Sequence, residues 1–144
     1  MSDEIIELQE EKEARYRLLV RPRLMELLKQ QIVEQVVVNK KYRDPAYTAK
    51  RLADDLDTNV KYISAVVRVK FHTNFCNYVN RYRVADAMAL LVNQRYLNLN
   101  VEDIGKLAGF AHRQTFHTAF LKQTGQSPNA YRKEQLELLK RFQM

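Results

Sequence analysis

The sequence contains little of what marks secreted, disulfide-rich or membrane proteins. Its 144 residues include one cysteine, no tryptophan, three glycines and three prolines. Cys76 alone cannot form an internal disulfide, and no second cysteine stands at a metal-ligand spacing from it. We expect Cys76 to be a small buried side chain beside Phe75 in a helix, with a redox-sensing role as the alternative. No run of about 18 apolar residues and no basic-then-apolar signal segment occurs, which predicts a soluble cytoplasmic protein without a membrane partner.

Charge is unevenly distributed along the chain. The formal net charge is +7. Residues 1–22 carry six acids and four bases, a net −2, so the remainder carries +9. A basic body behind an acidic leader indicates a polyanionic partner, although many basic proteins bind nothing specific.

Long stretches with a 3.6-residue hydrophobic period, together with the scarcity of glycine and proline, predict an all-α protein. Residues 1–21 are charged with a thin apolar stripe, which predicts an exposed N-terminal helical arm; a frayed tail is the alternative. Pro22 fits the first turn of the helix that follows. We therefore divide the chain into this arm and a domain of residues 22–144, which contains a long uninterrupted helix at about 75–94 and a terminal helix at about 128–141.

Residues 101–123 have the pattern of a helix-turn-helix. Val101 and Ile104 share one face of a short helix, for which Asn100 is the expected N-cap. Gly109 lacks a Cβ and suits the left-handed residue that ends such a helix. A second amphipathic helix follows, and its outward residues are polar or basic: His112, Arg113, Gln114, His117 and Thr118.

Residues 48–71 repeat this pattern. Thr48 and Asn59 are the expected N-caps of the two helices, and Asp57-Thr58 supplies the turn. The outward positions of the second helix of this copy include Lys61, Ser64, Ala65 and Arg68. Each copy alone also fits an ordinary helical hairpin with a solvated face. Two copies are much rarer by chance than one, and we interpret them as an internal duplication.

Three stretches contain sequence motifs that are typical of a known protein family. They are LA–DL–TN–YIS in the first copy, RV–A–ALL in the long helix, and DI–LAGF–RQTF–AFLKQTGQSPNAYR in the second copy. On these motifs, residues 47–132 resemble the DNA-binding domain of the AraC/XylS family of bacterial transcription regulators. The resemblance implies about seven helices in addition to the arm, arranged as two homeodomain-like helix-turn-helix subdomains joined by the long central helix. It also implies two recognition helices that read adjacent major-groove segments of DNA.

The resemblance assigns contacts to individual residues by position. The implied base-contact candidates are Lys61, Ser64, Ala65, Arg113, Gln114, His117 and Thr118. The implied phosphate-contact candidates are Lys61, Arg68, His112 and Lys122. Among them, Arg113 suits guanine O6 and N7, and Gln114 suits adenine N6 and N7.

Several positions depart from the family's pattern. Ala65 and Thr118 stand where arginine is common, so both recognition helices lose a strong contact. Asp57 and His72 stand where glycine is common, so these turns need a residue that tolerates an unusual φ. Gly105 replaces the usual alanine, at a cost to the helix of about 1 kcal/mol. A further departure removes a common serine cap, at Ala111.

The leading interpretation is a sequence-specific, double-stranded DNA-binding transcription regulator, cytoplasmic and nucleoid-associated. RNA polymerase, and a self-associating or sensor partner at the N-terminal arm, are further candidate partners. The alternative is a protein-interaction module that keeps the fold but has lost specific DNA reading. We expect no enzymatic activity, no cofactor and no metal site, because the three histidines, His72, His112 and His117, form no ligand array and no acid–base–nucleophile set is visible.

Overall fold

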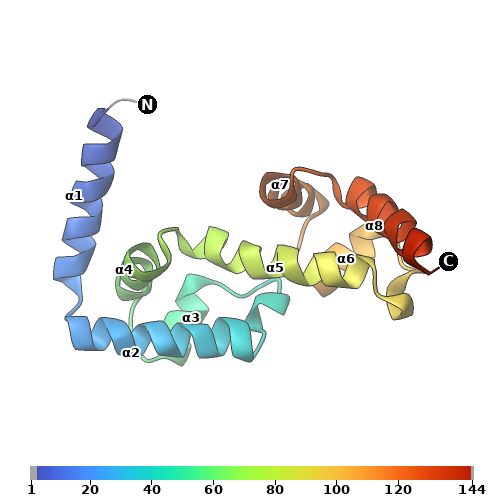
Figure 1. Cartoon of the computed structure of the whole chain (residues 1–144). Helices are drawn as coiled ribbons and strands as arrows, with labels where there is room; N and C mark the ends of the chain where they lie inside the picture. Colours follow the sequence, from blue (N-terminus) through green and yellow to red (C-terminus); the bar gives the residue numbers. More distant parts are fainter. Residues whose placement is uncertain (1–2, 144) are drawn as a thin grey trace. The chain divides into compact units, whose positions relative to one another are not determined.

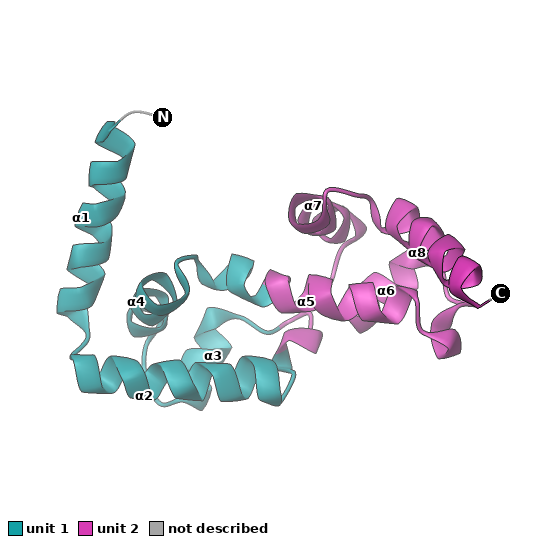
Figure 2. Cartoon of the chain, viewed as in Figure 1, with its two compact units in different colours: residues 1–41, 47–79 teal, residues 42–46, 80–144 magenta. Residues whose placement is uncertain are grey.

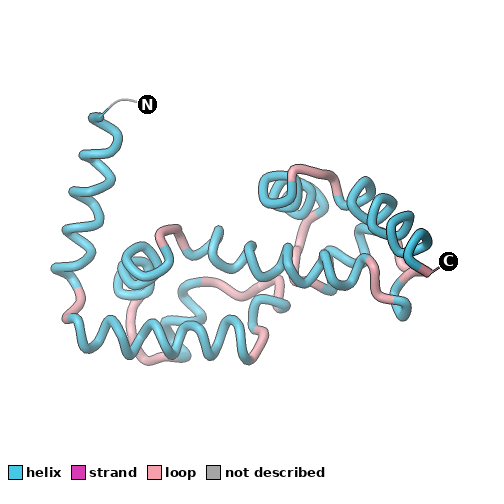
Figure 3. Tube along the Cα trace, in the orientation of Figure 1, coloured by secondary structure: helices cyan, strands magenta, loops and turns pink. Residues whose placement is uncertain are grey.

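The computed structural model describes residues 3–143, and every regular element within that range is helical, which confirms the all-α prediction (Figures 1 and 3). The eight α-helices are α1 (Asp3–Leu19), α2 (Pro22–Val33), α3 (Ala49–Asp55), α4 (Val60–Phe71), α5 (Phe75–Leu91), α6 (Val101–Leu107), α7 (Arg113–Thr124) and α8 (Pro128–Phe142). A π-helical turn, Glu34–Val38, follows α2, and single 3-10 turns occupy Lys41–Arg43 and Gln94–Tyr96. No helix in the described range is both long and apolar enough to cross a membrane.

The chain forms two compact units, and each contains one helix-turn-helix (Figure 2). Unit 1 comprises residues 1–41 and 47–79, and therefore holds α1, α2 and the α3–α4 pair. Unit 2 comprises residues 42–46 and 80–144, and holds α6, α7 and α8. The long helix α5 contributes its first residues to unit 1 and the rest to unit 2.

Local capping chemistry fixes where three of the four helices of the two helix-turn-helix motifs begin, namely α3, α4 and α6. The predicted caps are confirmed, because each side-chain oxygen accepts a hydrogen bond from a backbone N–H of the first turn and thereby satisfies a donor that has no partner within the helix. The pairs are Thr48 with Arg51 at 3.2 Å, Asn59 with Tyr62 at 2.9 Å, and Asn100 with Asp103 at 2.8 Å. Helix α8 begins in the same way, with Ser127 as its cap and Pro128 in its first turn.

The core of unit 1 lies between α2, α3 and α4. Its fully buried side chains include Ile32 of α2, Leu52 of α3 and Ile63 of α4. At the surface, Lys70 of α4 lies 3.0 Å from Glu26 of α2, and the lysine lowers the pKa of that exposed carboxyl group. This pair marks the side of α4 that faces α2.

A tyrosine at the edge of unit 1 is held as the neutral phenol. Tyr47 is 5% exposed, and its hydroxyl lies 3.5 Å from a carboxylate oxygen of Asp55. Burial, with the nearby charge of Asp55, raises the pKa of Tyr47 to about 12. The phenol therefore stays un-ionised throughout the physiological range.

The core of unit 2 is built around three phenylalanines. Phe110, Phe116 and Phe120 are 2% exposed or less, and their rings lie 5.0 and 5.8 Å apart in sequence order. The residues that complete this cluster come from α5, from α6 and from the C-cap of α6: Val84, Ala87, Leu91, Val101, Ile104 and Ala108. Tyr131 of α8 packs edge-on against Phe120 at 5.5 Å. Rings in this tilted geometry contribute more than their buried area alone.

Arg132 ties α8 to the rest of unit 2. Its guanidinium donates hydrogen bonds to the backbone carbonyls of Leu91, Tyr96 and Leu99, at 2.9, 2.8 and 2.6 Å. These carbonyls lie at the end of α5 and in the loop beyond it, where helical partners are missing. The basic charge of Arg132 is therefore used inside the fold and is not offered to a ligand.

Residues 42–46 form a short strap that belongs to unit 2 although it precedes the first helix-turn-helix in sequence. Arg83 of α5 donates to the carbonyls of Tyr42 and Asp44 at 2.6 and 3.0 Å. Arg43 forms a two-pronged ion pair with Asp86 at 2.7 and 2.9 Å, and this pairing raises the pKa of the guanidinium further above its ordinary value. The positive charge of Arg43 is therefore neutralised by Asp86.

The structure corrects one prediction about the fold. Cys76 is exposed, whereas we expected it to be buried beside Phe75. Consecutive helix positions point about 100° apart, so the two side chains take different directions. Phe75 is the inward one, and its ring packs 6.5 Å from that of Tyr47.

Candidate nucleic-acid interface

The position of α7, the second helix of its helix-turn-helix, depends on two glycines of the same motif, one in α6 and one in the turn between α6 and α7. Gly109 has a φ of +110° in the turn, and a Cβ on it would overlap the carbonyl oxygen of Tyr42. Gly105 is buried in α6, and a Cβ there would lie 2.5 Å from the ring of Phe116 in α7. The departure from alanine at Gly105 therefore has a structural reason, because it lets Phe116 pack closely against α6.

The helix begins one residue later than the expected serine-cap position implies. The N-cap of α7 is His112, and its side chain makes no capping hydrogen bond. Ala111 precedes this position, so our placement of the lost cap at Ala111 is wrong by one residue. The backbone N–H groups of the first turn of α7 therefore receive no capping hydrogen bond from His112, and exposed N–H groups at a helix start favour anions.

The outward face of α7 carries most of the predicted contact residues. Arg113, Gln114 and Thr118 are exposed, as are the predicted phosphate contacts His112 and Lys122. Gln114 and Thr118 are four residues apart and therefore share one stripe of the helix. These side chains are accessible for hydrogen bonding to a ligand that approaches α7.

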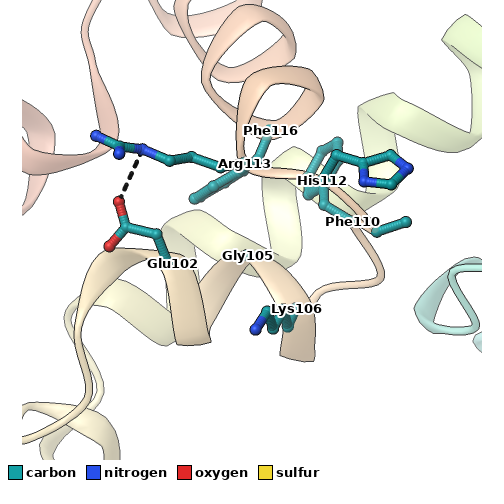
Figure 4. A pocket seen from close by; sticks show the side chains of 8 residues that line it. Glu102, Gly105, Lys106, Phe110, His112, Arg113 and Phe116 are labelled. Atoms are coloured by element: carbon teal, nitrogen blue, oxygen red, sulfur yellow. Dashed lines mark ion pairs between the residues drawn. The ribbon is translucent and has the colours of Figure 1, made fainter.

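Glu102, which the sequence analysis did not single out, lies against this face (Figure 4). Its carboxylate oxygen Oε1 is 3.2 Å from Nε of Arg113 and 3.8 Å from Nε2 of His117. The acid is presented by the first turn of α6, and it lines a hollow of about 180 Å³ together with Lys106 and Phe116 among others. Arg113 is 72% exposed, so this ion pair restrains its direction more than it stabilises the fold.

His117 is less available than the outward pattern predicted. Its side chain is 28% exposed, and its Nε2 atom is buried without a hydrogen bond, facing the carboxylate of Glu102. Its ring also packs edge-on against Phe116 at 5.7 Å. The expectation that His117 points freely outward is therefore wrong, because the side chain turns toward α6.

The first recognition helix, α4, differs at its outward face. Lys61 and Arg68 are exposed and Ser64 is half-buried. Ala65 is 0% exposed and Val69, one turn further on, is 4% exposed. The prediction of an outward Ala65 is wrong, and in this conformation Ala65 is inaccessible to a base.

Helix α1 lies beside this part of α4. The two helices pack against each other in unit 1. A hollow of about 440 Å³ between them is lined by Lys12, Arg15, Tyr16, Leu19 and Lys61. Lys61, a predicted base and phosphate contact, therefore has residues of the N-terminal arm as its neighbours.

Within residues 3–143, three residues other than glycine adopt a positive φ, and two of them were predicted. Asp57 and His72 have φ values of +54° and +58°, which confirms that the turns around α4 need left-handed residues. Lys40, at +54°, was not foreseen. The residues next to Lys40 form no turn motif that would predict its positive φ.

The histidines and acids of the described range gather into no group of three or more that could hold a metal ion. His112 is exposed at the start of α7, and His72 closes α4 in unit 1. The candidate interface on α7 and α4 therefore consists of cationic, amide and hydroxyl side chains.

Two helix-turn-helix units, one of them with an exposed cationic and amide-bearing second helix, define a protein of the double helix-turn-helix class. A family model described as a helix-turn-helix domain matches residues 52–134, which is more than half of the chain. The chain belongs to this AraC-type helix-turn-helix family, and with it to the DNA-binding transcription regulators. The resemblance read from the sequence is thereby confirmed.

Solved structures agree with the family. A protein of unknown function from Listeria innocua is 27% identical with a TM-score of 0.65, over 72% of this chain and 93% of that one. The C-terminal domain of the two-component response regulator yesN from Fusobacterium nucleatum is 26% identical with a TM-score of 0.61, over 76% and 98%. The C-terminal domain of AraT, a response regulator from Geobacillus stearothermophilus, shares the fold at 24% identity and a TM-score of 0.63, over 79% and 86%. No curated protein sequence matches the chain.

Proposed function

We propose that this protein is a sequence-specific regulator that binds double-stranded promoter or operator DNA through α7 and α4. The observation that carries the proposal is the exposure of Arg113, Gln114 and Thr118 together on α7. The major groove admits one α-helix and displays a distinct pattern of donors and acceptors for each base pair. Side chains of this kind, on a helix that follows a tight turn, match that pattern.

Each exposed residue of α7 has a proposed role in binding. Arg113 donates two hydrogen bonds to guanine O6 and N7, and Gln114 pairs with adenine N6 and N7. Thr118 contacts a base edge or a thymine methyl group. His112 and Lys122 hold phosphates, which position the helix without reading sequence.

Arg113 has two alternative partners, the carboxylate of Glu102 in the free protein and a guanine in the complex. In the free protein the guanidinium is held by the carboxylate of Glu102, 3.2 Å away. In the complex a guanine replaces this carboxylate, and the exchange favours DNA only where a base offers two acceptors at the right place. The pair therefore weakens binding to all DNA while it sharpens the choice of base.

Helix α4 supplies the second set of contacts. Lys61 and Arg68 are the exposed cations and bind phosphates, and Ser64 contacts a base edge. This helix lacks an exposed side chain with the two parallel donors of arginine on its predicted base-contacting positions. We therefore expect α7 to supply most of the sequence preference. RNA polymerase and a partner at the N-terminal arm stay predictions of the sequence.

The test is selection of bound fragments from a random double-stranded DNA library at about 150 mM salt, since affinity without a stated salt concentration cannot be interpreted. Arg113→Ala and Gln114→Ala should each weaken binding to the selected site by roughly 5- to 150-fold, the range of about 1–3 kcal/mol expected for one two-pronged base contact. Arg141→Ala is the matched control, because Arg141 is an exposed arginine at the end of α8.

The outcomes separate the two functions considered. Selection of a motif that Arg113→Ala loses and Arg141→Ala keeps supports specific DNA reading. An equal loss for both arginines would reduce the interaction to net charge. No enriched motif, from protein that circular dichroism shows to be folded, would favour the protein-interaction module instead.

A further inference from the structure

Helix α1 packs on α4 from the side opposite to α2. Lys70 of α4 faces α2, because it pairs with Glu26. Lys61, nine residues earlier, lies on the opposite side of α4, because nine helical steps of about 100° make two and a half turns. Lys61 is also the residue of α4 that lines the hollow with α1. In Figure 1, α1 (blue) stands beside α4 (green), in agreement with the contacts between them.

The stripe of α4 on this side is covered. Lys61, Ala65 and Val69 follow one another at four-residue intervals and therefore form one stripe. Ala65 is 0% exposed and Val69 is 4% exposed, although the core-facing side of α4 is the one that carries Ile63 and Val67. The helix that lies on the Lys61 side is α1, so α1 buries this stripe.

Helix α1 lies on the side of α4 that carries the predicted contact Lys61, so α4 cannot present this side to the major groove without α1 beside it. One helix with its side chains is about 10–12 Å across, and packed helices stand about 8–10 Å apart, so the pair spans roughly 20 Å. The major groove is about 12 Å wide. The arm therefore prevents α4 from entering the groove in this conformation.

Charge acts in the same direction as width. Helix α1 carries six carboxylates and three bases, a net −3. An acidic helix beside α4 repels the phosphates that flank a groove. The helix is held weakly, because none of its residues is fully buried and because Lys12 and Arg15 meet Lys61 in a hollow that no carboxylate lines.

We propose that α1 is a reversible cover of the first recognition helix: α7 binds DNA with the cover in place, and α4 binds only after α1 has moved away. This proposal rests on the proposed function, since it concerns the regulation of the same DNA-binding surface. It assigns the N-terminal arm an intramolecular role in place of the oligomerisation role considered from the sequence. Whatever holds or displaces α1 then sets how many base pairs the protein reads.

The test loosens α1 without changing α4. The double substitution Tyr16→Ser/Leu19→Ser removes the two apolar side chains of α1 that line the hollow. Leu18→Ser is the matched control, because Leu18 is 87% exposed and its neighbour Leu19 is 42% exposed. Release of the arm is measured by trypsin cleavage after Lys12, Arg15 and Arg17, and binding is measured by titration and footprinting on the selected DNA at about 150 mM salt.

The cover predicts that the double variant is cleaved faster in α1, binds the selected DNA at least about threefold more tightly, and protects additional base pairs beside those that α7 protects. Leu18→Ser should match the wild type in all three measurements. Unchanged cleavage in the double variant would overturn the proposal, because α1 would not be held by these residues. Faster cleavage with unchanged affinity would overturn it as well. A fall in affinity would also overturn the proposal, because α1 would then contribute to binding, through phosphate contacts of Lys12 and Arg15.

Arg113→Ala in the same titration keeps the two proposals apart. If it weakens binding while the double variant leaves affinity unchanged, the cover fails and DNA reading by α7 stands. If neither the wild type nor the double variant prefers any sequence, the proposed function fails and the cover fails with it.

Discussion

The two helix-turn-helix units place left-handed residues around their recognition helices with different amino acids. Unit 1 uses Asp57 and His72, at φ values of +54° and +58°. Unit 2 uses Gly109 and Gly125, at +110° and +80°. The difference shows that a positive φ alone does not require glycine, whereas a positive φ together with a close backbone contact does. A residue with a Cβ pays only the cost of the left-handed region in unit 1, whereas at Gly109 the Cβ would also collide with the chain.

The units also differ in what restrains the recognition helix. Helix α1 packs against α4, and Ala65, a predicted base-contact position of α4, is buried. The outward residues of α7 stay exposed apart from His117, and Arg113 is restrained by one carboxylate, that of Glu102. The second helices of the two motifs thus have different neighbours: α4 packs against a further helix, α1, whereas Arg113 of α7 forms an ion pair with Glu102.

The largest expected effect is at Gly109. Gly109→Ala should destabilise unit 2 by about 3–5 kcal/mol, because it adds a collision with the carbonyl of Tyr42 to an unfavourable φ. Denaturant unfolding followed by circular dichroism measures the change. Gly125→Ala is the matched control: its φ is also positive, but no atom lies within 4 Å of the added Cβ, so it should cost only about 1–2 kcal/mol. Equal losses at the two positions would show that the collision is relieved by a small shift of residues 42–46.

A smaller effect of opposite sign is expected in unit 1. His72→Gly should stabilise the protein by about 0.5–1 kcal/mol, because glycine relieves the left-handed strain at an exposed helix end. The same substitution at Lys50, exposed within α3, should instead destabilise by about 1 kcal/mol. Thermal unfolding of the two variants provides the comparison. Destabilisation by His72→Gly would mean that the imidazole makes a stabilising contact that outweighs the strain.

The smallest expected effect concerns the ion pair on α7. Glu102→Gln should raise affinity for all double-stranded DNA by about threefold at 150 mM salt, because it removes a negative charge near the phosphates and releases Arg113. The ratio of affinities for the selected site and a scrambled site should fall. Glu137→Gln, at an exposed acid of α8, should change neither quantity. A rise in that ratio would show that Glu102 does not compete with guanine for Arg113.

Features set by local chemistry could be predicted from the sequence. The caps at Thr48, Asn59 and Asn100 follow from side chains that reach their own first turn, so no distant residue is needed to place them. The left-handed turns at Asp57 and His72 followed from their place in the motif. The fold class followed in the same way, because helical periodicity is a property of each segment.

Features set by distant contacts could not be predicted. Periodicity shows which face of α4 joins the core of its own unit, but it does not show that α1 packs against α4 or that Ala65 is buried. The pairing of Glu102 with Arg113, and the turn of His117 toward α6, depend on how two helices cross. An acid in the first turn of α6 was visible in the sequence, but such acids are common because they suit a helix start.

Residues 42–46 affect whether the second helix-turn-helix can be separated from the rest of the chain. The second helix-turn-helix appears complete in sequence from residue 80 onward, yet its unit includes five residues that precede the whole first motif. A gene fragment that encoded residues 80–144 alone would leave Arg83 without the carbonyls of Tyr42 and Asp44, and Gly109 without the backbone it packs against. The two motifs read as a duplication, but the second one uses five residues from ahead of the first. We therefore expect residues 80–144 alone to be less stable than the same residues joined to 42–46.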